Sequence, residues 1–497
     1  MTSATTASAP LQSFLEGGAK KLLIGDQWVE AASGRTMPSI DPSTGKLLVD
    51  VADADAEDVT RAVAAARKAF VGPWRATTPA ARQRLLWRIA DVLEAHYAEL
   101  KVLTAADMGS PVGPDPRLGA EGVMDMIRYL AGWATKISGD TLPNSVPGML
   151  TYTRKEAIGV VGAYVPYNSP LTQFIKKLGA VLATGCTLVV KPADDASLTV
   201  LRIAELCLEA GVPEGVLNVV TGGPKAGVAI AENAEVDSIV FTGSTAVGQE
   251  LVRLAAGNLK RLTLELGGKS PHIIFADSDV ERAVTTAAVM VFANSGQGCS
   301  NGTRLFVERP IYEDVVQRLT GIAGALRVGN SLDPETTHGP VITERHLGRV
   351  LGYVESGQQE GARLVAGGSR VEDDDLAHGY FVEPTVFADV QDSMRIAREE
   401  IFGPVACILP FDSFDEVVAR ANATSFGLAG GVWTRDIGKA HRLADALQAG
   451  TVWVNTYNML DPGVPFGGYK TSGWGKEAGA ESLEGFLNTK SVWINTQ

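Results

Sequence analysis

From Gly159 onward, short apolar runs rich in valine and isoleucine alternate with stretches whose apolar residues recur at helical spacing. The runs are GVVGAYVP, TLVVKP, VLNVVTG, DSIVFTG and RLTLELG. Buried strands that alternate with helices are typical of a parallel sheet covered by helices on both faces. The sequence therefore predicts an α/β fold with a doubly wound, Rossmann-like sheet. Such sheets bind ligands beyond the carboxyl ends of their strands.

A second alternating unit begins after Gly268, where PHIIFAD, TRLFVE, VACILPF, LAGGVWT and GTVWVN are the predicted strands. The chain has 497 residues, which is too long for one ordinary hydrophobic core, so two or more domains are expected. Between Ala56 and Ile137, three segments have the periodicity of amphipathic helices. The second of these is predicted as one helix from Arg82 to a stop at Gly109.

Residues 139–158, GDTLPNSVPGMLTYTRKEAI, are extended and interrupted by proline, as in a hairpin arm. Leu150, Tyr152 and Arg154 fall on one side of this arm. The C-terminal KSVWINTQ is predicted as a short strand that has no partner close to it in sequence. Because unpaired strands of this kind pair with other chains, we expect a homodimer or a homotetramer.

The formal net charge of −13 disfavours nucleic acids and anionic membrane surfaces as partners. No apolar run reaches the roughly 20 residues of a membrane-spanning helix, and the small, polar N-terminus lacks the pattern of a signal peptide. The four cysteines lie far apart, without the spacing of a zinc site or a disulfide framework, so no metal centre is predicted. A reducing cytoplasm is therefore the expected location.

Cys299 lies in the segment NSGQGCSNGTR, where glycines and small polar residues surround it. A structural cysteine normally has apolar neighbours. A nucleophilic cysteine needs access and donors for an oxyanion, which flanking glycines can provide. No histidine is close to it in sequence, so a Cys–His dyad is not indicated. From this loop alone, a nucleophile and an ordinary small loop residue stay equally open.

Glu265 ends the predicted strand RLTLELG, just before Gly267 and Gly268. Burying a carboxylate at an apolar strand end is costly and raises its pKa, which suits a general base. An ion-paired structural glutamate is the equal alternative from local sequence. If Cys299 is a nucleophile without a histidine, Glu265 becomes its candidate base.

Three further segments have features of a nucleotide site. In FTGSTAVG, Gly243 and Ser244 end a strand and start a helix whose N-terminus suits a pyrophosphate, although most such turns are only helix caps. In VVKPADD, Lys191 and Asp194 follow a strand and suit ribose hydroxyls, with a surface turn as the commoner alternative. In EEIFGPV, a glutamate and an aromatic ring suit a ribose and a base, or they simply end a helix.

In this order along the chain, the motifs PYNSPL, KPA, FTGSTAVG, LELGGKSP, GQGC, EEIFGPV and PFGGYKTSG resemble those of the NAD(P)-dependent aldehyde dehydrogenase superfamily. The resemblance runs from about Leu22 to the C-terminus. It implies an NAD-binding domain from residues 1–138 and 159–266, and an α/β catalytic domain from residues 267–476. It also implies a small β oligomerisation arm from residues 139–158 and 477–497.

The resemblance implies that a small-molecule aldehyde is oxidised to its acid. Cys299 corresponds to the nucleophile, and Asn168 to the side-chain donor of the oxyanion hole. Glu265 corresponds to the base that activates water, which releases the acid from a cysteine thioester. Lys177 and Glu477 match positions of proton relay or support.

NAD is the cofactor that the resemblance implies. The implied cofactor-binding residues are Lys191, Asp194, Gly243, Ser244, Glu400, Phe402, Pro166 and Tyr167. Asp194 stands where strongly NAD-selective relatives have glutamate. Its carboxylate would repel a 2′-phosphate, which favours NAD, but the shorter side chain leaves room for NADP.

Positions that line the substrate tunnel in the family are smaller or less aromatic in this chain. These positions are Tyr167, Ser169, Ala293, Leu460 and Gly122. The resulting wider channel predicts a bulky apolar aldehyde of a terpenoid, aromatic or long-chain kind. Lys176 in the same region could instead face a carboxylate on the substrate, which favours a semialdehyde.

Two other functions are alternatives. A coenzyme A-acylating relative typically lacks the water-activating glutamate, so Glu265 disfavours it. A non-catalytic structural protein with this fold is the remote alternative, which the presence of Cys299, Asn168 and Glu265 disfavours.

Overall fold

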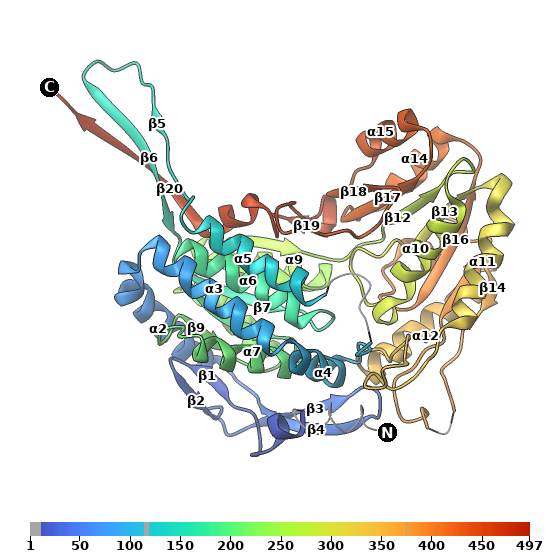
Figure 1. The fold of residues 1–497 in the computed structure, drawn as a ribbon, viewed down its shortest axis with the longest axis horizontal. Helices are drawn as coiled ribbons and strands as arrows, with labels where there is room; N and C mark the ends of the chain where they lie inside the picture. Colours follow the sequence, from blue (N-terminus) through green and yellow to red (C-terminus); the bar gives the residue numbers. More distant parts are fainter. Residues whose placement is uncertain (1–10, 114–118, 374) are drawn as a thin grey trace.

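The computed structural model describes residues 11–113, 119–373 and 375–497. Two helix-covered sheets lie side by side, and a narrow β ribbon with the C-terminus projects from the upper left of Figure 1. The predicted α/β class is confirmed. Residues 1–10 and 114–118 of the predicted NAD-binding domain lie outside the described residues. None of the helices within the described ranges is long and apolar enough to cross a membrane.

The first sheet has eight strands among the described residues, in the order β19–β11–β10–β7–β8–β9–β1–β2. Its parallel centre consists of β7 (Val160–Val165), β8 (Thr187–Pro192), β9 (Leu217–Val219), β10 (Ser238–Thr242) and β11 (Arg261–Glu265). At its edges run the antiparallel strands β1 (Leu22–Ile24), β2 (Gln27–Val29) and β19 (Gly473–Trp474). The strands predicted between Gly159 and Gly267 are confirmed.

Four helices connect the central strands of this sheet. They are α6 (Pro170–Thr184), α7 (Leu198–Glu209), α8 (Pro224–Glu232) and α9 (Thr245–Leu254). Along β7, Val161 and Ala163 face one hydrophobic core, whereas Val160 and Tyr164 face the other. The chain places β8 and β9 on one side of β7, then returns to place β10 and β11 on the other. This reversal between β7 and β10 creates the crevice where open α/β sheets bind ligands.

The N-terminal part adds a hairpin and four helices. These are β3 (Thr36–Asp41), β4 (Lys46–Ala52), α2 (Ala56–Val71), α3 (Pro79–Ala95), α4 (Tyr97–Met108) and α5 (Ala120–Trp133). The single helix predicted from Arg82 to Gly109 is wrong, because the chain divides into α3 and α4 at His96, where φ is −104° and ψ is 11°. Both helices pack on α6 and α7, so the apolar pattern continues through the break. The predicted stop is confirmed, since Gly109 has a φ of 83°.

The second sheet, again counted over the described residues, has the order β14–β15–β16–β13–β12–β17–β18. Its strands are β12 (Pro271–Ile274), β13 (Arg304–Glu308), β14 (Arg363–Ala366), β15 (Thr385–Ala388), β16 (Val405–Phe411), β17 (Ala429–Trp433) and β18 (Thr451–Val454). Its helices are α10 (Val280–Phe292), α11 (Tyr312–Ala325), α12 (Glu344–Gln359), α13 (Arg395–Arg398), α14 (Phe414–Asn422) and α15 (Ile437–Ala446). Of these strands β14 runs antiparallel to its neighbour, and the others are parallel. The strands predicted after Gly268 are confirmed.

Short 3₁₀ turns complete the described elements. They are η1 (Pro73–Ala76), η2 (Ala255–Asn258), η3 (Ala293–Gly296), η4 (Arg309–Ile311), η5 (Lys470–Ser472) and η6 (Ala480–Phe486). Of these, η3 contains the first residues of the Cys299 segment and ends three residues before the cysteine.

The projecting ribbon consists of β5 (Thr141–Leu142), β6 (Met149–Ala157) and β20 (Leu487–Asn495). β20 pairs with β6 along its whole length, from Leu487 opposite Ala157 to Asn495 opposite Met149. The C-terminal strand thus has a partner in the hairpin arm of its own chain, far away in sequence. β20 is an edge strand, and its Trp493 side chain is exposed.

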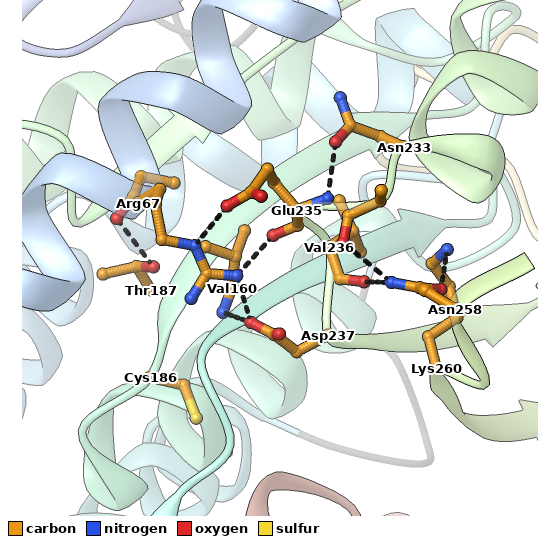
Figure 2. Close-up of polar contacts among 12 residues, drawn as sticks. Arg67, Val160, Cys186, Thr187, Asn233, Glu235, Val236, Asp237, Asn258 and Lys260 are labelled. Atoms are coloured by element: carbon orange, nitrogen blue, oxygen red, sulfur yellow. Dashed lines mark hydrogen bonds and ion pairs between the residues drawn. The ribbon is translucent and has the colours of Figure 1, made fainter.

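Polar contacts fix the point where the arm returns to the first sheet (Figure 2). Asp237 Oδ2 accepts a hydrogen bond from the Val160 N–H at 2.7 Å and pairs with Arg67 of α2. Arg67 Nη2 also donates to the Glu235 carbonyl at 2.6 Å. Gly159 has a φ of 141°, and a Cβ there would lie 1.8 Å from Asp237 Oδ2. Only glycine allows the chain to pass this close to the Asp237 carboxylate. The hydrogen bond from the Val160 N–H to Asp237 then anchors the start of β7.

Candidate active site

The predicted site residues gather at the carboxyl ends of the first sheet's strands. Tyr167 and Asn168 follow β7, Ser244 follows β10, Lys191 lies in the last two residues of β8, and Glu265 ends β11. Because β7 and β10 lie next to each other at the topological reversal, these ends surround one crevice. The Gly243 N–H donates to the Glu265 carbonyl at 3.0 Å and ties two of the strand ends together.

The loop before Cys299 turns sharply. Asn294 and Ser295 have φ angles of 53° and 54°, and Gly296 has a φ of 74°. A Cβ on Gly296 would lie 2.1 Å from the carbonyl carbon of Gly403, so no larger residue fits. Gly296 is thus required by backbone packing, whereas a Cβ on Gly298 would meet the Asn301 side chain at 2.3 Å.

Side chains hold this loop in place. Gln297 Nε2 donates to the Asn294 carbonyl at 3.1 Å, and Gln297 Oε1 accepts from the Ile342 N–H at 3.0 Å. On the far side, the Tyr457 hydroxyl donates to the Ser300 carbonyl at 2.9 Å. Cys299 is half-buried in this rigid loop, whereas the other three cysteines are buried.

Asn168 lies against the same loop. Its Nδ2 donates to the Gln297 carbonyl at 3.0 Å, and Asn294 Nδ2 donates to the Asn168 carbonyl at 3.0 Å. A side-chain amide carries two hydrogens, so the second one stays available for an anion beside Cys299.

Burial raises the pKa of the Cys299 thiol to about 12. The negative charges of Glu400 and Glu265 act in the same direction, and the charge of Lys176 opposes them. The resting side chain is therefore a neutral thiol, and a nucleophilic step needs a base close to it.

Glu265 has the properties of such a base. Its side chain is 4% exposed, and neither carboxylate oxygen has a hydrogen-bond partner among the described residues. Burial raises its pKa well above the usual range, and the charge of Glu477 adds to this effect. A Cβ on Gly467 would lie 2.5 Å from Glu265 Oε1, so the carboxylate lies directly against glycine backbone. A buried, unpartnered carboxylate of this kind is available to a water or a substrate.

Lys177 and Glu477 form a buried ion pair behind Glu265. Lys177 Nζ lies 2.5 Å from Glu477 Oε1 and also donates to Thr242 Oγ1 at 2.7 Å and to Gln173 Oε1 at 3.1 Å. Burial alone would raise the pKa of Glu477, but the charges of Lys177 and Lys176 outweigh it and hold this pKa below the usual range. Glu477 is therefore a fixed negative charge next to Glu265.

The predicted cofactor residues lie around the helix that follows β10. Ser244 is the N-cap of α9, and its Oγ accepts from the Val247 N–H at 3.4 Å. A Cβ on Gly243 would lie 2.4 Å from the Phe241 ring, so the ring packs against this turn and the position requires glycine. Lys191 is 8% exposed and donates to the Pro192 carbonyl at 3.0 Å, while Asp194 is exposed.

Glu400 lies on the Gly267–Gly268 turn that follows β11. Its Oε1 accepts from the Gly268 N–H at 2.9 Å, and a Cβ on Gly267 would lie 2.3 Å from Oε2. Burial raises the pKa of Glu400 to about 7. The structure thus places Glu400 close to Cys299 as well as at the crevice.

A group of rings joins the end of β7 to the segment EEIFGPV. Phe402 has a φ of 60°, and its ring lies edge to face with Tyr167, with 5.9 Å between the ring centroids. His346 Nε2 lies 2.7 Å from the Phe402 carbonyl oxygen. Sequence analysis missed His346, because nothing in its local sequence connects it to a segment that lies 56 residues away.

This arrangement fits a dinucleotide. The N-terminus of α9 and the Ser244 hydroxyl present donors suited to a pyrophosphate. Lys191 carries a donor and Asp194 an acceptor of the kind that ribose hydroxyls bind.

Comparison with known proteins decides which family this site belongs to. The model of the aldehyde dehydrogenase family matches residues 28–492. The mitochondrial aldehyde dehydrogenase of Equus caballus is 47% identical over 480 residues, which covers 95% of each chain. The chain belongs to the aldehyde dehydrogenase family. The aldehyde dehydrogenase of Enchytraeus buchholzi is similar as well, with 46% identity over 480 residues and 96% of each chain covered.

A solved structure of a similar protein contains the cofactor that the site predicts. The NAD⁺ complex of the aldehyde dehydrogenase from Bacillus cereus is 46% identical to this chain, with a TM-score of 0.95, and covers 98% of this chain and 99% of its own. The predicted family, the enzymatic activity and the use of NAD are confirmed, and this aldehyde dehydrogenase is NAD-dependent.

Proposed function

We propose that this aldehyde dehydrogenase forms a covalent intermediate on Cys299, with Asn168 as the oxyanion donor and Glu265 as the base for water. The observation that carries the proposal is the state of Glu265. Its carboxylate acts electrostatically on the Cys299 thiol, and both oxygens lack protein partners in the described part of the chain. A carboxylate held in this way can bond a water and take a proton from it.

In the first step the Cys299 sulfur adds to the aldehyde carbon and loses its proton to a nearby carboxylate. Glu265 suits this transfer because its pKa is raised toward that of the thiol. The carbonyl oxygen becomes an anion, toward which Asn168 Nδ2 and the Cys299 N–H donate. NAD⁺, when bound, supplies the acceptor for the hydride that leaves this thiohemiacetal carbon. The product on Cys299 is a thioester.

In the second step Glu265, having passed its proton to solvent, accepts a proton from a water whose oxygen adds to the thioester carbon. The tetrahedral intermediate collapses, the carbon–sulfur bond breaks, and the carboxylic acid leaves. The Cys299 thiolate then takes the proton back from Glu265, which restores the resting thiol and the Glu265 carboxylate. A coenzyme A-acylating reaction would need no base for water, so the unpartnered Glu265 supports hydrolysis. The presence of Cys299, Asn168 and Glu265 together supports an enzyme over a non-catalytic structural protein.

The substrate channel supports a bulky aldehyde. Ser169 and Ala293 are both small and half-buried, and they lie next to Asn168 and Asn294 in sequence. Leu460 packs with Phe466 against the cluster that contains Tyr457. We propose a terpenoid, aromatic or long-chain body for the substrate, in place of a two-carbon one.

The organisation of the chain is also proposed. Residues 1–138 and 159–266 form the NAD-binding domain, residues 267–476 the catalytic domain, and residues 139–158 with 477–497 an arm for a homodimer or homotetramer. The pairing of β20 with β6 in one ribbon supports the arm. Within the proposed catalytic range, β19 pairs with β11 and so extends the first sheet. A cytoplasmic location stays a prediction.

Absorbance of NADH tests the chemistry. The wild-type enzyme, Cys299→Ala and the control Cys207→Ala, which changes a buried cysteine, are mixed with NAD⁺ and an aldehyde, with and without coenzyme A. The aldehydes are acetaldehyde, benzaldehyde, a long-chain aldehyde, a terpenoid aldehyde and succinic semialdehyde. We expect NADH without coenzyme A from the wild type and the control, and none from Cys299→Ala. Equal rates from Cys299→Ala would refute the proposal, and a highest kcat/KM for acetaldehyde would refute the wide channel.

A further inference from the structure

Lys176 in α6 places an ammonium group close to the nucleophile. The residue is 7% exposed. Its Nζ lies 5.8 Å from the centroid of the Phe466 ring. The described part of the chain offers this ammonium neither a hydrogen bond nor an ion pair within contact distance. Its charge favours the ionised forms of both the Cys299 thiol and the Glu265 carboxylate.

The helix geometry explains this position. Asn168 lies just before α6, and Thr172 and Lys176 follow it at intervals of four residues. Residues four apart stack on one face of a helix, so Thr172 and Lys176 share a face of α6, whose N-terminus follows Asn168. Lys176 lies six residues after Pro170, which is about 9 Å along the axis. Since side chains in a helix tilt toward its N-terminus, the Lys176 side chain leans back toward Asn168.

The wall opposite this ammonium is apolar. Phe466 and Leu460 are half-buried and pack on the cluster of Met290, Trp453 and Tyr457. Through the bond from the Tyr457 hydroxyl to the Ser300 carbonyl, this cluster is attached to the Cys299 loop. A molecule that reaches from Cys299 to Lys176 therefore passes along an apolar surface and ends at a cation.

The two neighbouring lysines, unlike Lys176, have acceptors for their ammonium groups. Lys177 bonds Glu477, Thr242 and Gln173. Lys476 Nζ donates to the Gly467 carbonyl at 2.8 Å. Of these three ammonium groups, Lys176 alone lacks an acceptor among the described residues. An anionic ligand would give the Lys176 ammonium the acceptor that it lacks among the described residues.

We propose that the substrate is an aldehyde that carries a carboxylate at the far end of an apolar body, and that Lys176 binds this carboxylate. The inference rests on the proposed oxidation at Cys299 and names its substrate class. The aldehyde carbon meets Cys299, the apolar body packs on Leu460 and Phe466, and the carboxylate accepts a charge-assisted hydrogen bond from Lys176. Lys176 thereby determines specificity without taking part in the bond changes.

The test compares aldehydes that differ in the charged group alone. The pairs are succinic semialdehyde with butanal, and para-carboxybenzaldehyde with para-methylbenzaldehyde. For each pair, the ratio of kcat/KM for the acid-bearing aldehyde to that for the neutral one is measured at fixed ionic strength. We expect the wild type to favour the acid in at least one pair. Lys176→Met, which keeps the length and removes the charge, lowers that ratio about tenfold or more through KM. Lys176→Arg retains the preference.

Lys476→Met is the matched control, because Lys476 also acts on Glu265 but is bonded to the Gly467 carbonyl. We expect this variant to leave the ratio unchanged. If Lys176→Met lowers kcat for both members of a pair by one factor and leaves the ratio unchanged, Lys176 acts through Glu265 alone and the proposal is wrong. A wild-type preference for the neutral aldehydes also overturns it while leaving oxidation at Cys299 intact. Absence of NADH from the wild type with every aldehyde would refute the proposed oxidation itself.

Discussion

The side-chain amide of Asn168 donates to the backbone carbonyl of Gln297 at 3.0 Å, two residues before Cys299. Asn168 follows β7 of the first sheet, whereas Gln297 lies between α10 and β13 of the second. This hydrogen bond therefore joins the loops of two sheets at the point where chemistry is proposed. The position of the proposed oxyanion donor is set by the same loop that holds the proposed nucleophile.

Asn168→Ala should lower kcat about a hundredfold or more, since removal of one oxyanion donor typically has this effect. The loss should fall on kcat more than on KM, because the bond to the oxyanion forms only in the transition state. Steady-state kinetics with NADH detection measure it. The control is Asn218→Ala, which removes a buried amide that donates to the Gly215 carbonyl at 2.8 Å. Asn218→Ala should lower Tm and leave kcat per folded molecule unchanged, and the same pattern for Asn168→Ala would contradict its catalytic role.

The pH dependence should respond to the charges around Glu265. Glu265 works as a base only when it is deprotonated, and its pKa is raised, so kcat should fall as pH decreases through that pKa. Glu477→Gln removes a negative charge that raises this pKa, so the acid limb of the profile should shift to lower pH. Lys476→Met removes a positive charge that lowers the pKa, so the limb should shift to higher pH. Shifts in the same direction for both variants would show that another group controls the profile.

Gly296→Ala should disrupt the nucleophile loop. The new methyl group would lie 2.1 Å from Gly403 backbone, and the φ of 74° is unfavourable for alanine, so the loop must move and activity should fall severely. The control is Gly321→Ala in α11, where no atom lies within 4 Å of an added Cβ. In that exposed helix position alanine should stabilise the protein by about 0.5–1 kcal/mol. Thermal unfolding and kcat/KM are measured for both variants, and a fully active Gly296→Ala enzyme would show that the loop tolerates displacement.

Asp194→Ser should increase the use of NADP. The exposed carboxylate at the edge of the proposed ribose site would repel a 2′-phosphate, and serine removes that repulsion. We expect the ratio of kcat/KM for NADP⁺ to that for NAD⁺ to rise about tenfold. The control is Asp125→Ser, which removes an exposed carboxylate on α5. An unchanged ratio in Asp194→Ser would place the ribose away from Asp194.

Sequence periodicity located the strands and therefore much of the candidate site. Lys191 and Glu265 were predicted at strand ends, and the structure places them there. These strand ends could be predicted because they depend on neighbouring residues, since an apolar run followed by turn residues determines where a strand stops. Once the strands are parallel, their carboxyl ends must meet at one edge.

Contacts between distant segments were beyond such patterns. The pairing of β20 with β6 joins residues that are more than 300 positions apart, and neither strand contains a signal for the other. The break at His96 was missed because the apolar face continues through it. The contact of His346 with Phe402 and the isolation of Lys176 depend on how whole elements pack, which local composition does not encode.

The central claim is that Glu265 activates the water that releases the acid from Cys299. The most direct measurement is pre-steady-state NADH formation by Glu265→Gln, with intact-protein mass spectrometry of the same samples. The account predicts a burst of one NADH per active site, followed by very slow turnover and a thioester mass adduct on Cys299. Continued turnover at the wild-type rate without an adduct would contradict it.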